Sequence, residues 1–323
     1  MKHIVIIHTG GIGDLVQTLP TLESVRQKWP QTRLTFIGRP ERAVLARLAG
    51  AADVCLDVET CGLWRIAAGA KNGGDLPPAL AEADLVLDFL FEGRLASALE
   101  RTGAWVVSPR PLPPADWAEP AARWIFEEVA KELDLPKVPL EPRLRIDDAA
   151  LEASRKVLAA SGIRGPARQG VAAASPAAVL HIGSGSRQKN WPAGRFADLA
   201  RRLREEMARP VVWLVGPAEE DWGLRPPAES GDAVIAQSGL DQLAGILALA
   251  DVYIGNDSGI TQIAAAVRRP DGRATPTVAI FGPSNADVWG PRGEHVRVVR
   301  SPDGTMGGIH VERVWAELRF LVR

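Results

Sequence analysis

The chain has 323 residues, of which 46% are hydrophobic and 24% are charged, and its formal net charge is -1. This length accommodates two domains of ordinary size, each with its own core. The near-zero charge argues against a general nucleic-acid binder, and no stretch of the sequence is long and apolar enough to cross a bilayer as a helix. The composition is that of an ordinary globular protein, and nucleic acid is not expected as a partner.

The cysteines and the N-terminal residues indicate the compartment. Cys55 and Cys61 fit no metal-ligand spacing and no disulfide framework, which favours a reducing compartment. The apolar run at the N-terminus is too short for a signal peptide, and no small-residue cleavage site follows it. We therefore expect a cytoplasmic protein.

The first half begins with a strand, a glycine-rich loop and a helix. Residues 3–8 are almost continuously apolar, as in a central parallel strand that is covered on both faces. A helix is predicted to open at Leu15. The intervening loop is a candidate ligand site at the first strand-to-helix turn, and four of its residues are expected to line a cleft: Thr9, Gly10, Gly11 and Gly13.

Asp14 is the chemically notable residue of this loop. A carboxylate at a helix start complements the helix dipole, and this can be its whole role. A carboxylate that lines a cleft can also act as a general base if its pKa and geometry suit. The residue pattern alone leaves both interpretations open.

The rest of the first half predicts strands at 34–38, 84–89 and 104–107 and helices at 118–134 and 147–162. Residues 163–176 are rich in glycine, proline and alanine and indicate a linker. We therefore expect an N-terminal domain at 1–165 and a C-terminal domain at 166–309. A final helix at about 310–323 is expected to pack back on the N-terminal domain.

The second half repeats the same order of elements. Residues 178–182 predict a strand, 183–190 form a small, polar and basic loop, and a helix begins at Trp191-Pro192. Residues 211–216 predict the next strand, followed by a helix start at Pro217. A further helix is marked by the apolar residues Leu240, Leu243, Ile246 and Leu247.

Residues 251–283 predict a strand, a tight turn, a helix and a strand, which is the pattern of a parallel sheet. Ile263, Ala264, Ala265 and Val267 suit one buried helical face. The turn at Asp257-Ser258-Gly259 would expose backbone N–H groups at the positive end of a helix, which favours a bound phosphate. We therefore expect this turn to cradle a diphosphate, with simple helix capping by Asp257 or Ser258 as the alternative.

A dinucleotide-binding fold is a rival interpretation. Gly11-Ile12-Gly13 supplies part of the glycine fingerprint, but Val16 stands where its third glycine or alanine belongs. The second strand ends without an acidic residue for a ribose. Arg39 and Arg42 could instead meet a 2′-phosphate, which keeps an NADP-dependent reductase open.

Four motifs in order along the chain resemble one family. They are Gly13-Asp14 followed by Thr18-Leu19-Pro20; the strand Asp84-Leu85-Val86-Leu87-Asp88; the segment from Gly183 to Lys189-Asn190-Trp191-Pro192; and Asn256-Asp257-Ser258-Gly259 with Ala264-Ala265-Ala266 and Phe281-Gly282-Pro283. Together they resemble the ADP-heptose:lipopolysaccharide heptosyltransferases of glycosyltransferase family 9. The resemblance implies an α/β GT-B fold, with two Rossmann-like doubly wound domains facing across a cleft.

The resemblance also assigns roles to residues. It implies Asp14 as the catalytic base and Lys189 as a phosphate-binding residue that assists catalysis. Glutamine stands at Gln262 where the family has histidine; it can donate hydrogen bonds but carries no positive charge. The implied donor and diphosphate site comprises Gly183, Ser184, Ser186, Lys189, Asp257, Ser258, Gly259 and Gln262. The implied nucleoside site comprises Glu219, Glu220 and Leu240.

The implied function is an inverting glycosyltransferase that needs no metal and no cofactor. It would move a heptose or related sugar from an ADP-sugar to a lipopolysaccharide-core-type acceptor, which is a glycolipid or an oligosaccharide. A lipid-linked acceptor would bring the protein to the cytoplasmic face of the inner membrane. The alternatives are a GT-B transferase with another nucleotide sugar or acceptor, and a sugar-nucleotide binding protein without catalysis.

Overall fold

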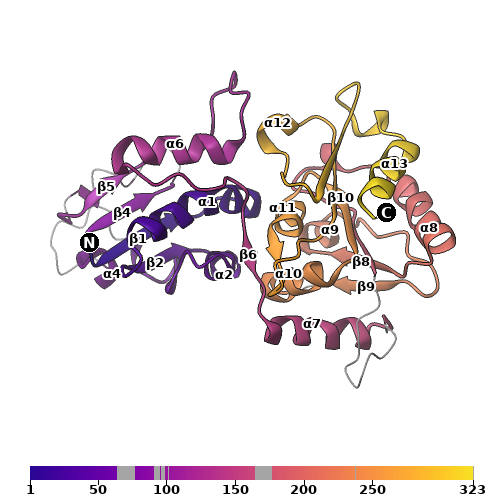
Figure 1. Cartoon of the computed structure of the whole chain (residues 1–323), viewed down its shortest axis with the longest axis horizontal. Helices are drawn as coiled ribbons and strands as arrows, with labels where there is room; N and C mark the ends of the chain where they lie inside the picture. Colours follow the sequence, from indigo (N-terminus) through magenta and orange to yellow (C-terminus); the bar gives the residue numbers. More distant parts are fainter. Residues whose placement is uncertain are drawn as a thin grey trace. The chain divides into compact units, whose positions relative to one another are not determined.

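The protein forms two compact units, Met1–Arg143 and Leu144–Arg323 (Figure 1). The computed structural model describes residues 1–63, 77–90, 95, 99–100, 102–163, 177–236 and 238–322. Among the helices of these residues, none combines the length and apolarity needed to cross a membrane.

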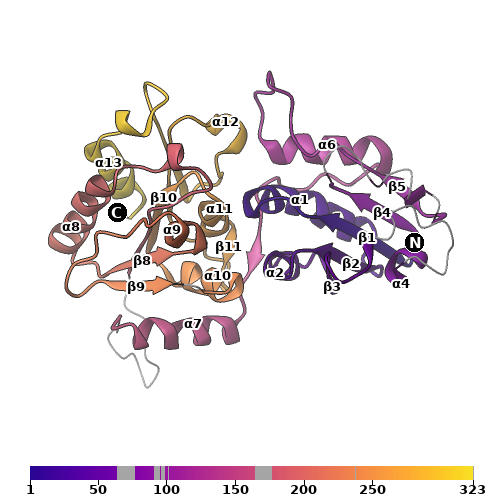
Figure 2. The same cartoon turned by 180° about the vertical axis from the view of Figure 1, so that it is seen from behind.

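The first unit is built on a five-stranded parallel sheet in the order β3-β2-β1-β4-β5. All six residues of β1 are buried, because it is a central strand with neighbours on both sides. Helix α1 contacts both α2 and α6 and lies between them (Figure 2). The elements are β1 (His3–His8), α1 (Ile12–Lys28), β2 (Arg33–Gly38), α2 (Pro40–Leu48), β3 (Val54–Asp57), α4 (Pro78–Ala81), β4 (Leu85–Asp88), β5 (Trp105–Val107) and α6 (Ala121–Leu133).

The second unit is built on a six-stranded parallel sheet in the order β13-β12-β10-β7-β8-β9. Its strands are β7 (Ala178–His181), β8 (Val211–Val215), β9 (Ala233–Ala236), β10 (Val252–Asn256), β12 (Thr277–Phe281) and β13 (Val296–Arg300). Its α-helices are α7 (Asp148–Ala160), α8 (Ala193–Met207), α9 (Pro217–Asp221), α10 (Leu240–Leu249), α11 (Gly259–Ala266), α12 (Ala286–Trp289) and α13 (Val311–Leu321). Two short 3-10 helices, η3 (Arg187–Lys189) and η4 (Met306–Gly308), and the paired short strands β6 (Leu144–Arg145) and β11 (Val267–Arg268) complete it.

Strand order places a ligand-binding position in each unit. In the second sheet the chain runs outward from β7 through β8 and β9, and then returns to add β10 on the other side of β7. In the first sheet the same reversal separates β1 from β4. Ligands of doubly wound sheets bind beyond the carboxyl ends of the strands at such a reversal. The predicted doubly wound architecture of both halves is therefore confirmed, and it directs attention to the turns after β1, β7 and β10.

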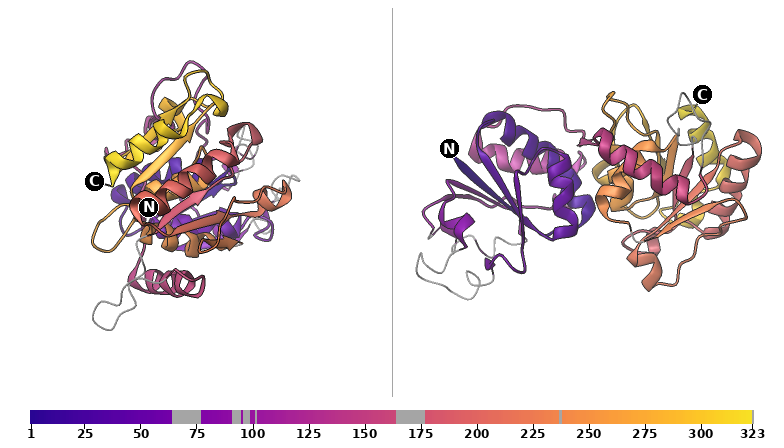
Figure 3. Two further views of the ribbon diagram at one scale, coloured as in Figure 1. Left: turned by 90° about the vertical axis from the view of Figure 1, so that its right-hand side faces the viewer. Right: turned by 90° about the horizontal axis from the view of Figure 1, so that it is seen from below.

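The predicted domain boundary is wrong. The boundary expected between residues 165 and 166 falls in 164–176, outside the described residues, and the compact units divide between Arg143 and Leu144. Helix α7 belongs to the second unit because it packs on α10 (Figure 3). The approach is close: a Cβ added at Gly245 would lie 2.2 Å from the Ser154 hydroxyl oxygen.

Two further expectations are corrected. Helix α13, which was expected to pack on the N-terminal domain, instead places Val314, Trp315 and Leu318 in the core of the second unit with α8 and the sheet. Val267 is not part of the buried helical face, because α11 ends at Ala266 and Val267 pairs with Leu144 in β11 and β6.

The packing of α13 predicts a stability difference along one helix. Leu318 is 0% exposed and Phe320 is 59% exposed. Leu318→Ala should lower the free energy of unfolding by about 2–5 kcal/mol, because it leaves a cavity in a packed core. Phe320→Ala is the control and should cost less than about 1 kcal/mol, mainly through its contact with Arg297. Urea unfolding followed by circular dichroism measures both, and equal losses would show that α13 is not part of this core.

Candidate functional site

Parallel pairing of β7 and β10 brings the two predicted donor-binding segments to one edge of the second sheet. Leu180 pairs with Ile254 and His181 with Gly255, so the two strands end within one residue of each other. The turn after β7 carries Gly183 to Lys189, and the turn after β10 carries Asp257 to Gly259. Segments more than sixty residues apart in sequence therefore meet at the reversal point of the sheet.

Lys189 and Asp257 form the charged pair at this edge. The Lys189 Nζ lies 2.7 Å from Asp257 Oδ2, and the two side chains are 35% and 11% exposed. Lys189 ends the 3-10 helix η3, whose turn is closed by the Lys189 N–H donating to the Ser186 carbonyl. The cation is therefore held at the sheet edge while remaining partly open to solvent.

Ser258 caps α11 in the adjoining turn. Its Oγ accepts the N–H of Thr261 at 3.3 Å, and α11 begins at the next residue, Gly259. The Thr261 hydroxyl also lies 3.0 Å from that of the buried Tyr253, whose pKa is raised by burial. The remaining first-turn N–H groups of a capped helix have no acceptor within the helix and favour an anion.

Asn256, the last residue of β10, joins the two turns. Its side chain is fully buried, and its Oδ1 accepts the backbone N–H of Trp191 at 3.0 Å. Its Nδ2 donates to the carbonyl oxygens of Ile182 at 2.8 Å and Gly183 at 3.4 Å. This residue lies in a family motif but was assigned no role from the sequence; a second signal was its amide at the end of an otherwise apolar strand.

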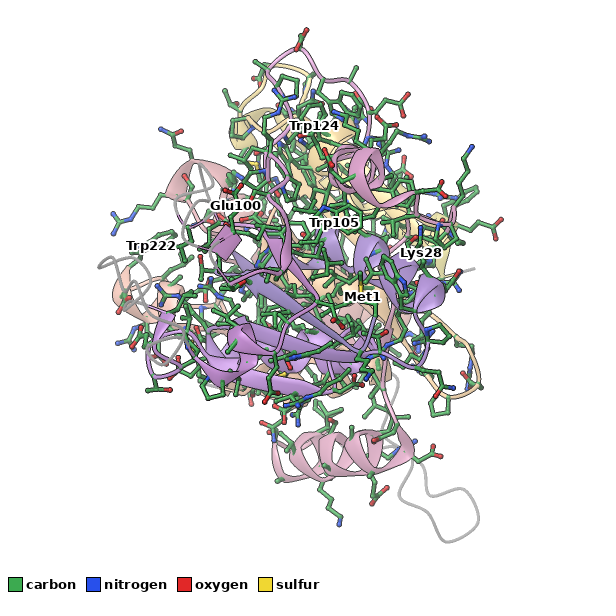
Figure 4. The ribbon with its side chains drawn as sticks, turned by 90° about the vertical axis from the view of Figure 1, so that its left-hand side faces the viewer. Met1, Lys28, Glu100, Trp105, Trp124 and Trp222 are labelled. Atoms are coloured by element: carbon green, nitrogen blue, oxygen red, sulfur yellow. The ribbon has the colours of Figure 1, made fainter. Side chains whose placement is uncertain are left out.

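The loop after β7 is closed by its own polar groups. The hydroxyl oxygen of Ser184, which is 4% exposed, lies 2.6 Å from the Ser186 carbonyl oxygen and 2.8 Å from Asn190 Oδ1. The Arg187 guanidinium lies 5.6 Å from the ring centroid of Trp222, which follows α9 and is labelled in Figure 4. The loop that carries Lys189 is thus attached to the end of α9 as well as to β10.

Glu219, predicted to contact the nucleoside, is almost fully buried. Its Oε2 accepts the Gly216 N–H at 2.6 Å, and its Oε1 lies 3.3 Å from His181 Nε2. Burial alone would raise the pKa of Glu219, but hydrogen bonds from the His181 ring and the Gly216 N–H hold the pKa of this carboxyl below its ordinary value. The carboxylate is therefore kept ionised and fixed at the start of α9. Sequence reasoning did not identify His181 as its partner.

The other predicted donor residues lie in the same unit. Glu220 is exposed on α9, and Leu240 is half-buried at the first position of α10. Gln262 is 5% exposed on α11, and its Nε2 donates to the carbonyl oxygen of Trp289 at the end of α12 at 2.7 Å. This amide donor is therefore used to hold α12 against α11.

In the first unit, Asp14 occupies the third position of α1. Its Oδ2 accepts the Gly11 N–H at 2.9 Å, and the side chain of this residue is half-buried. The carboxylate thus lies at the helix start, where it complements the helix dipole, and its second oxygen adds further acceptor capacity. Arg42 Nη1 donates to the carbonyl oxygens of Thr9, at 3.2 Å, and Gly10. These bonds hold Arg42 to the loop before Asp14.

His8, at the end of β1, lies buried behind this loop. Its ring centroid is 6.0 Å from that of Phe89 and 6.4 Å from that of Phe36. Burial lowers the pKa of His8 from 6.5 to about 4; the charge of Asp14 opposes this shift and that of Arg42 adds to it. The imidazole is therefore neutral at neutral pH, and the loop that carries Asp14 rests on an uncharged ring.

The two aspartates of the motif around β4 both accept backbone N–H groups. Asp84 Oδ2 accepts the backbone N–H groups of Lys2 and His3, which fixes the start of β1. Asp88 is fully buried, and its Oδ1 accepts the Leu90 N–H at 3.0 Å. Burial raises the pKa of Asp88. Within the described part of the chain, no three His, Cys, Asp or Glu side chains gather as a metal-binding group.

The contact between Gly183 and Glu219 predicts the effect of one methyl group. A Cβ at Gly183 would lie 1.4 Å from Glu219 Oε1, whereas a Cβ at Gly185 in the same loop would meet nothing within 4 Å. Gly183→Ala should therefore displace the carboxylate and cost about 1–3 kcal/mol of stability, as overpacking does. Gly185→Ala is the matched control and should leave the unfolding temperature near that of the wild type. Scanning calorimetry measures the melting temperatures of both variants. Similar values for the two would contradict the observed contact.

The lowered pKa of His8 predicts acid sensitivity. Between pH 6.5 and 4 the unfolded chain binds a proton at this position and the folded chain does not, so stability should fall as the pH falls through this window. The full loss is about 3 kcal/mol. His8→Gln should remove this part of the pH dependence, while both proteins should show equal slopes between pH 7 and 8. Urea unfolding at several pH values measures it, and an unchanged acid loss in His8→Gln would exclude His8 as the cause.

Comparison with known proteins identifies the family. A model of glycosyltransferase family 9 (heptosyltransferase) matches residues 97–313. Lipopolysaccharide heptosyltransferase 2 of Escherichia coli is 30% identical over 127 residues, which span 35% of this chain and 32% of that relative. The structure of E. coli ADP-heptose lipopolysaccharide heptosyltransferase II gives a TM-score of 0.76 at 20% identity and covers 100% of this chain and 98% of that one. E. coli heptosyltransferase WaaC with ADP gives 0.70 at 19% identity, with 99% of each chain covered. The chain therefore belongs to glycosyltransferase family 9, the heptosyltransferase family, and has the GT-B fold of these enzymes.

Proposed function

We propose that this protein is an inverting glycosyltransferase that moves a heptose or related sugar from an ADP-sugar to a lipopolysaccharide-core-type acceptor. The observation that carries the proposal is the Lys189–Asp257 pair beside the N-terminus of α11, at the reversal point of the second sheet. A partly exposed cation next to first-turn N–H groups favours a diphosphate. One of the similar structures, E. coli heptosyltransferase WaaC, is described with ADP.

The donor diphosphate would bind at the edge of the second unit. Lys189 and the backbone N–H groups of Ser258 and Gly259 would stabilise the negative charge that develops on the leaving phosphate. Asp257 keeps Lys189 in place before the donor arrives, and the diphosphate then becomes a second anionic partner of the same cation. This arrangement supplies charge stabilisation from protein groups alone, so the proposed reaction uses no metal and no cofactor.

Asp14 would act as the general base. Its Oδ2 is oriented by the Gly11 N–H, which fixes the carboxylate relative to the helix start. The carboxylate would remove the proton from an acceptor hydroxyl as that oxygen attacks the anomeric carbon of the donor sugar. The bond from this carbon to the diphosphate breaks on the opposite face, so the configuration inverts and the nucleotide leaves with the electron pair. A lipid-linked acceptor would place the protein at the cytoplasmic face of the inner membrane.

Replacement of the proposed base tests the mechanism. Asp14→Asn keeps an oxygen acceptor for the Gly11 N–H but cannot take a proton. The turnover number should fall by about 10²- to 10⁴-fold, while affinity for ADP stays within about twofold of the wild type. Asp148→Asn, at an exposed first-turn position of α7, controls for loss of a charge at a helix start and should keep full activity. Full turnover in Asp14→Asn would exclude Asp14 as the base.

Nucleotide binding tests the donor class. Calorimetric titrations with ADP, UDP, GDP and NADPH, first without metal and then with magnesium, should show metal-independent binding of ADP alone. Lys189→Ala should weaken ADP binding by about tenfold or more, because it removes a charged hydrogen bond. Preference for UDP or GDP would move the donor to another nucleotide sugar within the same fold. Binding of NADPH alone would overturn the proposal.

A further inference from the structure

We propose that Asn256 is a positioning residue that holds Lys189 against Asp257 and thereby sets the affinity of the second unit for the donor diphosphate. The proposal rests on the proposed function for its ligand, and on the hydrogen bonds of one buried amide for its geometry. Neither Asn256 nor any of its partners except Gly183 belongs to the donor site that the sequence predicts.

The amide of Asn256 can adopt only one orientation. Its Oδ1 faces a donor, the Trp191 N–H, and its Nδ2 faces two acceptors, the carbonyl oxygens of Ile182 and Gly183. A flipped amide would place an oxygen against two carbonyl oxygens and an NH₂ group against an N–H. The surrounding backbone therefore requires a donor and an acceptor on the same side chain, which only an amide of this length supplies.

These bonds join the backbones on either side of the ion pair. Trp191 follows Lys189 by two residues, and it is itself fixed: it is 2% exposed, and its Nε1 donates to the Ile309 carbonyl at 2.8 Å. Asp257 follows Asn256 directly. A single side chain thus ties the segment that carries the cation to the turn that carries the anion, which accounts for their separation of 2.7 Å.

Because Asn256 is buried, losing any of its hydrogen bonds would cost stability. Asn256 is 0% exposed and lies two positions after Ile254, which belongs to the apolar core on the same face of β10. A buried amide stabilises a fold only when its hydrogen bonds are made, so an apolar side chain would serve burial alone at least as well. The polar side chain is instead explained by the fixed position that it gives to the turn after η3.

A double-mutant cycle tests whether Asn256 acts through Lys189. Asn256→Ala should weaken ADP binding by about tenfold in the wild-type background, because the Lys189 turn loses its bond to β10. In a Lys189→Ala background the same substitution should change ADP affinity by less than about twofold, because the group that it positions is absent. Calorimetric titration gives all four dissociation constants.

Thr275→Val provides a matched control for loss of stability. Thr275 is 1% exposed and its hydroxyl donates to the Leu247 carbonyl at 2.7 Å. It precedes β12 and therefore lies at the opposite edge of the parallel sheet from the two turns. Thr275→Val should lower the unfolding temperature and leave ADP affinity unchanged.

A second measurement does not depend on nucleotide. The rate at which Lys189 is acetylated by acetic anhydride, followed by mass spectrometry, reports how firmly its amine is held by Asp257. Asn256→Ala should raise this rate several-fold, and Thr275→Val should leave it unchanged. If Asn256→Ala does not fold, Asn256→Ser replaces it in both the ADP titration and the acetylation measurement.

The two assays separate the possible failures. Equal losses of ADP affinity in both backgrounds would overturn the inference, because Asn256 would then act on the fold in general. An unchanged acetylation rate in folded Asn256→Ala would overturn it as well. If the wild type binds no ADP, the proposed function fails, and the acetylation rate still decides whether Asn256 positions Lys189.

Discussion

The constraint on which the second unit depends is the parallel pairing of β7 with β10. These strands are far apart in the chain and adjacent only because the sheet reverses its order of addition between them. Their carboxyl ends lie at one edge, and so the turns that follow must meet there. The polar groups at this edge then satisfy one another: Lys189 with Asp257, the Asn256 amide with two backbones, and Glu219 with His181 and the Gly216 N–H. The same reversal between β1 and β4 places Asp14 at the corresponding edge of the first sheet.

Charge is distributed unequally between these two edges. In the second unit Asp257 pairs with Lys189, and hydrogen bonds from the His181 ring and the Gly216 N–H hold the pKa of the Glu219 carboxyl below its ordinary value. In the first unit the ring beneath the catalytic candidate is neutral, because burial lowers the pKa of His8 to about 4. The Arg42 guanidinium donates hydrogen bonds to the carbonyl oxygens of Thr9 and Gly10 and so fixes the backbone before Asp14. The proposed diphosphate site thus lies at one edge, and the other edge presents the half-buried carboxylate of Asp14.

Local patterns in the sequence predicted most of the elements, and long-range packing decided what they did not predict. The apolar runs at 3–8, 178–182 and 251–254 became β1, β7 and β10, because buried parallel strands require such runs. The domain boundary was misplaced because a Gly/Pro/Ala-rich segment signals a break in structure but does not say which unit holds the preceding helix; the contact of α7 with α10 does. The position of α13 depends on which core accepts Trp315 and Leu318, which periodicity cannot show. The motifs located Lys189 and Asp257. Asn256 lies in the same motif as Asp257, but its structural role, like that of His181, depends on partners distant in sequence and could not be predicted.

Hydrogen exchange with and without ADP, read by mass spectrometry, tests most directly the central claim that the edge of the second sheet binds the donor diphosphate. ADP should slow exchange in peptides covering 183–191 and 256–262, because it would contact the backbone N–H groups of both turns and tighten the segment that carries Lys189. The loop at 9–14 in the first unit should change less. Protection confined to that first loop, or ADP binding without protection of either turn, would contradict the account.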